Sequence, residues 1–152
     1  MGDALPIREA SLERSRTTPI VLRPIGVVRS SLKSVEDAPR FYTENAPPAL
    51  LEIYPRYRRA LIGLRPGMEL IVITWLHHAR RDLLTTHPRG DRTRPRRGVF
   101  LTRSPSRPNP LGLHRCQVLE VRREGLWIQA IEAIDGTPVV DLKRVVEGSD
   151  DS

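Results

Sequence analysis

Short apolar runs are the feature that most restricts what this chain can fold into. Stretches rich in Val, Ile and Leu are separated by Gly, Pro or pairs of charged residues, a pattern typical of β-strands joined by turns. We predict strands over six such stretches, residues 25–30, 69–76, 98–102, 116–121, 126–134 and 139–146. A hairpin is expected at Glu124-Gly125, and one short helix over residues 55–61, where Pro55 suits a first helical turn. The fold class is therefore predicted to be all-β, a small closed or nearly closed antiparallel barrel with short helical segments.

A doubly wound α/β fold does not fit this sequence. No pair of amphipathic helices lies between the predicted strands, and neither a Gly-x-Gly turn nor a Walker-type phosphate loop occurs. Any nucleotide cofactor must therefore be held in another way. The 152 residues suit one domain with a core of its own. We expect a mobile N-terminal arm at residues 1–21, the barrel domain at 22–146 and an acidic tail at 147–152.

The cellular setting follows from what the sequence lacks. No apolar run approaches the roughly 20 residues that cross a bilayer, and the N-terminus lacks the apolar core of a signal peptide. We therefore expect a cytoplasmic protein with no membrane partner.

Cys116 is the only cysteine, so an intramolecular disulfide cannot form. It has no evident activating base and no Ser-His-Asp spacing stands out, which disfavours nucleophilic hydrolysis.

Positive charge is concentrated in one polar segment. The chain carries a formal net charge of +7, and residues 80–107 contain nine arginines but only two aspartates. This segment alone accounts for the excess, as expected of a surface that receives a polyanion. A GC-rich genome would favour arginine over lysine everywhere, but would not gather it in one place.

A proline-rich loop follows within the same region. Pro105, Pro108 and Pro110 restrict the backbone of residues 103–110, so the loop is expected to be extended and stiff before any ligand arrives. Arg103 and Arg107 could then present forked donors, and Asn109 a donor and an acceptor, at small entropic cost. The alternative is that the prolines only end a strand and the arginines are solvated.

Residues 135–138, Asp-Gly-Thr-Pro, predict a tight turn between two strands. Two interpretations remain open: the turn is only a connection, or its backbone groups read a planar base at the barrel rim. His77 and His78 are expected to point to opposite faces of a strand, so we predict no metal site and a pocket-lining role for one of them. Trp75 and Trp127 are predicted to lie in the core.

The wider pattern around the proline-rich loop is specific. Residues 102–105 read Thr-Arg-Ser-Pro, residues 107–110 read Arg-Pro-Asn-Pro, and Gly112-Leu113 follow. Residues 135–141 read Asp-Gly-Thr-Pro-Val-Val-Asp, with Lys143 beyond them. Over about residues 24–146 the chain resembles the TrmO family, also called TsaA-like. This resemblance implies a homodimeric β-barrel methyltransferase that uses S-adenosyl-L-methionine to methylate the exocyclic amine of threonylcarbamoyladenosine beside the tRNA anticodon.

The resemblance also implies functional residues. The cofactor site would comprise Pro39, Arg40, His77, His78, Arg103, Leu113, Asp135, Gly136, Thr137 and Pro138. RNA contacts with the tRNA anticodon loop are expected from Arg89, Arg92, Arg94, Arg96, Arg97 and Arg107. The regions of Asn109 and Asp135 are the candidates for positioning the reacting groups, and no general base is assigned.

The sequence departs from the family pattern at several positions, and the usual Lys-Pro-Tyr ending reads Lys143-Arg144-Val145 here. Phe41 replaces a usual glutamine, and Met68 and Glu69 stand where the family has a Ser-His pair. The fold and cofactor tolerate these changes better than the acceptor does. Two alternatives therefore remain open: a barrel methyltransferase acting on another nucleoside or a smaller molecule, and a noncatalytic RNA-binding module.

Overall fold

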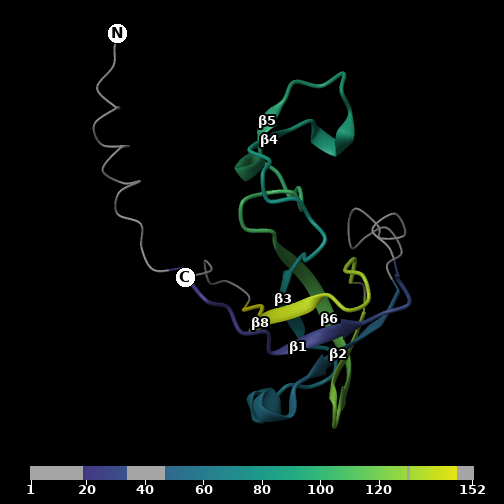
Figure 1. Ribbon diagram of the computed structural model, residues 1–152. Helices are drawn as coiled ribbons and strands as arrows, with labels where there is room; N and C mark the ends of the chain where they lie inside the picture. The colour runs from purple at the N-terminus through teal and green to yellow at the C-terminus, as the bar shows by residue number, and fades with distance from the viewer. Residues whose placement is uncertain (1–18, 34–46, 130, 147–152) are drawn as a thin grey trace.

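Six strands form a closed antiparallel barrel in the computed structural model, which describes residues 19–33, 47–129 and 131–146 (Figure 1). The strand order around the barrel is β1-β2-β7-β6-β3-β8. These strands are β1 (Gly26–Arg29), β2 (Ala49–Ile53), β3 (Glu69–Trp75), β6 (Leu111–Arg122), β7 (Gly125–Gln129) and β8 (Pro138–Arg144). The prediction of an all-β antiparallel barrel is confirmed. No helix in the described part of the chain is long and apolar enough to cross a membrane.

The core fills the inside of the barrel because alternate side chains of each strand point inward. Leu51 on β2, Leu70 and Val72 on β3, and Leu126 and Ile128 on β7 are all at most 1% exposed. Burying such a side chain stabilises the fold by about 1.5–3 kcal/mol. The predicted arm and tail lie outside the described residues, apart from residues 19–21.

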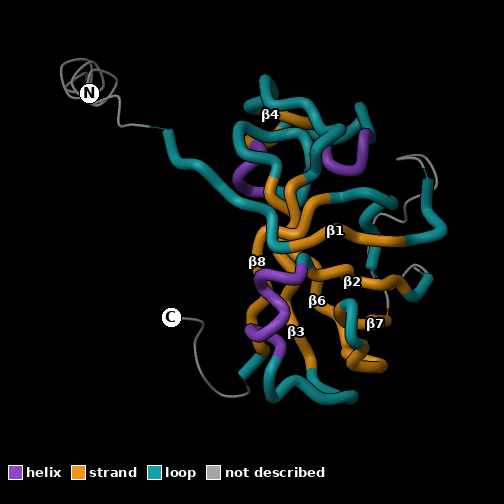
Figure 2. The backbone as a smooth tube through the Cα atoms, turned by 60° about the horizontal axis from the view of Figure 1, so that its bottom comes forward, coloured by secondary structure: helices purple, strands orange, loops and turns teal. Residues whose placement is uncertain are grey.

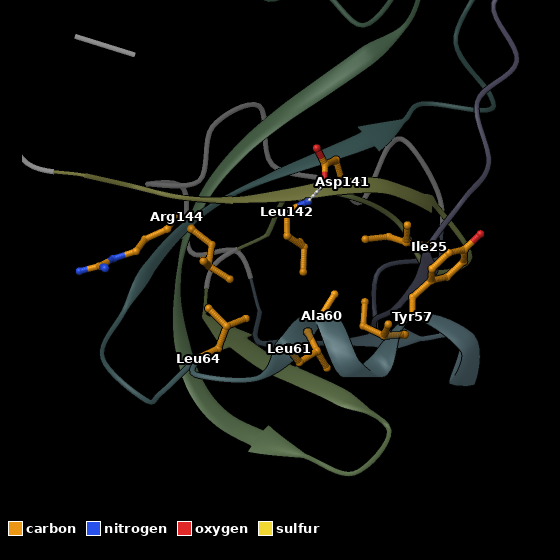
Figure 3. Close-up of a pocket in the computed structure, with 10 residues that line it drawn as sticks. Ile25, Tyr57, Ala60, Leu61, Leu64, Asp141, Leu142 and Arg144 are labelled. Atoms are coloured by element: carbon orange, nitrogen blue, oxygen red, sulfur yellow. Dashed lines mark hydrogen bonds between the residues drawn. The ribbon is translucent and has the colours of Figure 1, made fainter. Parts of the chain in front are cut away.

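One end of the barrel is closed by apolar contacts. The 3₁₀ helix η1 (Pro55–Leu61) connects β2 to β3 beneath this end, and its position agrees with the predicted helix. Leu61 and Leu64 point toward Leu142 of β8 across a small apolar hollow (Figure 3). Leu61 is 9% exposed, whereas its neighbour Ile62 is 80% exposed. The helix therefore acts as an apolar plug for this end.

The opposite end carries a projecting lobe formed by residues 76–110 (Figures 1 and 2). It contains β4 (Thr85–Thr86), β5 (Arg97–Gly98) and the 3₁₀ turns η2 (Pro88–Gly90) and η3 (Val99–Leu101). The predicted strand over residues 98–102 is wrong. Val99 is buried and its N–H donates to the carbonyl of Leu84, while the Arg107 guanidinium donates to the carbonyls of Val99 and Thr102. These bonds fold the short apolar run into a turn.

Other strand limits also differ from the predictions. β6 begins at Leu111, well before the predicted start at residue 116, because Gly112 and His114 occupy inward positions that an apolar pattern does not reveal. β7 ends at Gln129, and residues 131–134 are not strand although Ile131 is buried. β2 and β4 were not predicted. The Glu124-Gly125 hairpin between β6 and β7 is confirmed.

The two tryptophans lie outside the core, contrary to the prediction. On β3 the inward positions belong to Leu70, Val72 and Thr74, so Trp75 points outward and is only half-buried. Its ring lies under the Arg81 guanidinium, 4.7 Å from the ring centroid. Trp127 is likewise half-buried on β7, with the Arg122 guanidinium 5.0 Å from its ring centroid. Both indoles therefore serve as surfaces for arginine.

Candidate functional site

The barrel topology brings the predicted cofactor segments to one rim. β3 pairs antiparallel with both β6 and β8, so the end of β3 and the starts of β6 and β8 share an edge. In this register Ile73 lies opposite Leu113, and Thr74 lies opposite Val139. The segments that contain His77-His78, Leu113 and residues 135–138 therefore meet at the end of the barrel from which the lobe projects.

The turn over residues 135–138 is docked on the end of β1. The Ser30 N–H donates to Asp135 Oδ1 at 2.9 Å, and Lys33 Nζ donates to Oδ2 at 3.0 Å. The N–H of Gly136 donates to the Val28 carbonyl at 2.7 Å. Gly136 has φ +83°, in the left-handed region that glycine enters without strain. The tight turn predicted from the sequence is confirmed.

Hydrogen bonding fixes the charge state of Asp135. The Ser30 N–H and then the Lys33 ammonium lower the pKa of this carboxyl, so it is ionised at neutral pH. The N–H groups of Asp135 and Thr137 are bonded to the Leu32 and Ile134 carbonyls. A planar ligand at this turn would therefore meet side-chain and carbonyl groups, because these N–H groups already have partners.

His77 and His78 lie together in the turn that follows β3. Their ring centroids are 3.9 Å apart with an interplanar angle of 39°. The expectation that they point to opposite faces of a strand is wrong, because β3 ends at Trp75. Burial, and next the neighbouring His78, lower the pKa of His77 and favour its neutral form. Within the described ranges, no group of three or more His, Cys, Asp or Glu residues is arranged to hold a metal ion.

A buried polar chain near the same rim was missed by the sequence analysis. His114 is 4% exposed inside the barrel, with Nε2 2.7 Å from Thr74 Oγ1 and Nδ1 2.8 Å from Glu132 Oε1. Glu132 Oε2 is buried and has no hydrogen-bond partner among the described residues. The available signal was the period of two along β6, which places His114 on the same inward face as Cys116 and Val118.

Cys116 lies deeper inside the barrel, where it is 5% exposed. Burial, with the nearby Glu132 as a second cause, raises the pKa of its thiol to about 12. The thiol is therefore protonated at neutral pH, whereas the nucleophilic form is the thiolate.

The proline-rich loop divides its two arginines between different tasks. The Arg107 guanidinium lies 2.5 Å from the Val99 carbonyl and 3.1 Å from the Thr102 carbonyl, and so holds η3 in place. Arg103 and Asn109 are exposed at the surface of the same loop. Arg107 thus has a structural role that the sequence analysis did not foresee, and a role in RNA binding remains a prediction.

The lobe carries the arginine-rich segment at this end of the molecule. Arg80 is paired with Asp82 at 2.7 Å, and Arg94 with Asp91 at 3.5 Å. Arg96 donates from Nε to the Thr85 hydroxyl at 3.1 Å. Three further exposed guanidinium groups have no ion-pair partner within the described ranges: Arg92, Arg97 and Arg103. The lobe is therefore a positively charged surface with few compensating carboxylates.

The remaining predicted positions fall elsewhere. Pro39, Arg40 and Phe41 lie outside the described residues. Met68 and Glu69 are placed at the start of β3, at the plugged end of the barrel, where Glu69 pairs with Arg115. Their departure from the family pattern therefore lies at the far end of the barrel from the rim that gathers the cofactor segments.

Comparisons with known proteins give a consistent result. The family model of the tRNA-methyltransferase O N-terminal domain matches residues 27–151. A probable S-adenosyl-L-methionine-binding protein of Methanothermobacter thermautotrophicus is 43% identical over 134 residues, which cover 86% of this chain and 93% of the relative. An S-adenosyl-L-methionine-binding protein of Archaeoglobus fulgidus is 41% identical over 125 residues, covering 82% of this chain and 88% of the relative.

The fold is also similar to that of a solved protein. A crystal structure of TrmO from Pseudomonas aeruginosa superposes with a TM-score of 0.69 at 27% sequence identity. The match covers 89% of this chain and 61% of the solved chain. This chain thus spans about three fifths of that TrmO, and nearly the whole length of the two archaeal relatives.

Proposed function

The chain belongs to the family of the tRNA-methyltransferase O N-terminal domain, and on this premise we propose that it is an S-adenosyl-L-methionine-dependent tRNA methyltransferase. The acceptor is the exocyclic amine of threonylcarbamoyladenosine next to the tRNA anticodon. One observation carries the proposal: the described segments of the predicted cofactor site meet at the rim from which the arginine-rich lobe projects. A cofactor bound at this rim would lie beside the arginine-rich lobe, which is the arrangement that methyl transfer to tRNA needs.

The chemistry of the rim suits this cofactor. S-adenosylmethionine carries two cationic groups, a carboxylate and an adenine. The rim offers the ionised carboxylate of Asp135 and a buried carboxylate oxygen, Glu132 Oε2, that lacks a partner among the described residues. β6 adds the side chain of Leu113, which is 50% exposed, and the proline-rich loop of the adjoining lobe adds the exposed guanidinium of Arg103. We infer that Arg103, Leu113 and residues 135–138 hold the cofactor, with His77 and His78 beside them.

The bound cofactor supplies a methyl group on a cationic sulfur, which an amine attacks in line. The acceptor nitrogen loses its proton as it gains the methyl group, the cofactor leaves as a neutral thioether, and the protein's main task is to align the two. No residue is assigned as the group that accepts the proton. Asn109 offers an exposed amide with donors and an acceptor at the rim. Asp135 holds the turn through Ser30 and Lys33, so its contribution is to keep that turn in shape. Asn109 thus remains the candidate for orienting the acceptor.

The lobe provides the RNA surface in this proposal. Its exposed guanidinium groups can contact phosphates, the sequence-independent part of nucleic-acid binding.

The lobe also carries exposed apolar side chains: Leu84, Phe100 and Leu101 are 66%, 83% and 72% exposed. Apolar side chains with this much exposure support the homodimer as the functional unit, since a partner surface would cover them.

The decisive experiment is nucleoside mass spectrometry of threonylcarbamoyl-modified tRNA incubated with the protein and S-adenosylmethionine. We expect that nucleoside to gain one methyl group. The variant R103A should abolish the gain, while R123A, an exposed arginine in the hairpin at the plugged end, should not. Cofactor binding without a methylated nucleoside would move the acceptor to another molecule. RNA binding that is steeply salt-dependent, without cofactor binding, would identify a noncatalytic module.

A further inference from the structure

Two buried polar side chains, Thr74 and His114, and the partly buried Glu132 are hydrogen-bonded in a row that connects the walls of the proposed cofactor site. We propose that Thr74, His114 and Glu132 form a clasp that positions the cofactor-binding segments. The inference rests on the proposed function and names positioning residues for that site. The clasp comprises these three side chains and the two hydrogen bonds between them, 2.7 Å from His114 Nε2 to Thr74 and 2.8 Å from Nδ1 to Glu132.

Each member of the clasp lies close in sequence to a different segment of the site. Thr74 on β3 precedes the His77-His78 turn, and His114 on β6 directly follows Leu113. Glu132, in the stretch after β7, precedes the turn that begins at Asp135. The two hydrogen bonds therefore join β3, β6 and the segment leading into residues 135–138. A shift in one wall of the site would have to stretch or break one of these bonds.

The two ring nitrogens of His114 link Glu132 to Thr74. Glu132 Oε1 is an acceptor when the carboxylate is ionised, so Nδ1–H of the ring donates to it. In the neutral ring Nε2 is then an acceptor, and the Thr74 hydroxyl donates to it. Both ring nitrogens are thus satisfied within a buried site, which restricts the ring to one orientation.

Gly112 explains how the clasp fits inside the barrel. Gly112 lies opposite Thr74 in the β3–β6 register and belongs to the Gly112-Leu113 pair of the signature. A Cβ atom added at Gly112 would lie 2.5 Å from Thr74 Oγ1 and 2.7 Å from His114 Nε2. Both distances are too short for real contacts, so glycine at this position leaves room for the hydrogen bond. The signature glycine is therefore a requirement of the clasp.

Filling the barrel with the polar side chains of the clasp costs folding free energy. Glu132 Oε2 is buried without a hydrogen-bond partner among the described residues, and an unpaired buried oxygen destabilises the fold. The plugged end of the same barrel is filled by Leu61, Leu64 and their apolar neighbours, which bury no unpaired polar atom. A polar chain at the opposite end therefore indicates a role in binding at that end.

The test compares cofactor affinity with stability in matched variants. T74V removes the hydroxyl and keeps the shape, T74S restores the hydroxyl, and G112A displaces the hydrogen-bonded pair. V118A removes apolar volume from the same strand at a position 1% exposed and distant from the rim, as the control for stability alone. Isothermal titration gives the Kd for S-adenosylmethionine, and thermal unfolding gives the Tm of each full-length variant.

We expect T74V and G112A to raise the Kd about tenfold, and T74S to stay within about twofold of the wild type. V118A should lower the Tm at least as much as T74V while leaving the Kd unchanged. An unchanged Kd in T74V, or a Kd that follows the Tm in every variant including V118A, would overturn the clasp but not the proposed function. A wild-type protein that binds no S-adenosylmethionine would overturn both.

Discussion

The two ends of the barrel solve the problem of closure in different ways. At one end, η1 places Leu61 and Leu64 against the strand ends, and the contacts are almost entirely apolar. At the other end, the hydrogen-bonded clasp lies close to the turn at residues 135–138, and the arginine-rich lobe projects outward (Figure 1). One sheet thus has an end that contributes mainly stability and an end that presents polar and charged groups. Removing side chains from the two ends should therefore change different properties.

The lobe extends this contrast, because it has little core of its own. Val99 is its one fully buried large apolar side chain among the described residues, while Leu84, Phe100 and Leu101 are exposed. Its β4–β5 ladder is two residues long on each strand. With few buried apolar contacts, the lobe should open locally at lower free energy than the barrel. Changes in the lobe should therefore alter ligand binding more than global stability.

The largest effect on stability is expected at the plugged end. L61A should lower the free energy of unfolding by about 2–4 kcal/mol, because it leaves a cavity between η1 and the barrel. The matched control I62A, at the adjacent exposed position, should change it by less than about 0.5 kcal/mol. Urea unfolding measures both values. Weaker S-adenosylmethionine binding in native L61A would contradict the separation of the two ends.

The next effect concerns the charged lobe. Replacing Arg92, Arg97 and Arg103 together by glutamine should weaken tRNA binding by about tenfold or more at moderate salt, and reduce the slope of log K against log salt by about two. Stability should change by less than about 0.5 kcal/mol, since these side chains have no ion-pair partner within the described ranges. Filter binding over a salt series gives the slope. An unchanged slope would show that the polyanion binds elsewhere.

A smaller effect is expected at the turn beside the clasp. G136A should destabilise the fold by about 1–2 kcal/mol, because alanine resists the left-handed backbone at φ +83°. G98A is the control: Gly98 has φ −58° and open space at the Cβ position, so alanine should be neutral or stabilise by up to about 1 kcal/mol. Chemical unfolding of both variants makes the comparison. Equal destabilisation would show that backbone conformation is not the cause.

The barrel was predictable because its signals are local. The apolar runs at β1, β3 and β8 gave these strands to within a few residues, and Pro55 marked the start of η1. The run Val99–Leu101 has the same apolar composition as a strand, yet forms a turn because the Arg107 side chain and the Leu84 carbonyl bond to it. Such tertiary contacts override local propensity and leave no mark on the local pattern.

The candidate site was predictable only in part, for the same reason. The proline-rich loop and the turn at Asp135 are contiguous in sequence, so their composition identified them. The clasp joins residues 40 and 18 positions apart, and its formation depends on the register between β3 and β6. A single sequence does not specify that register. The pairing of His77 with His78 was likewise missed, because it depends on where β3 ends.

The smallest effect is a pH dependence at Asp135, whose side chain is 28% exposed. The Ser30 N–H and Lys33 lower the pKa of this carboxyl in the folded state, so its ionised form stabilises the fold above the unfolded pKa of about 3.9, and that contribution is lost as the pH falls below it. The stability difference between wild type and D135N should therefore be greatest above about pH 5 and shrink in acid, remaining below about 1 kcal/mol for such an exposed group. Urea unfolding from neutral to acidic pH measures it. K33Q should lose less stability than D135N, because the Ser30 N–H lowers the Asp135 pKa more than Lys33 does. An equal loss of stability would assign the effect to the ion pair with Lys33 and leave no contribution from the hydrogen bond between Ser30, at the end of β1, and the turn.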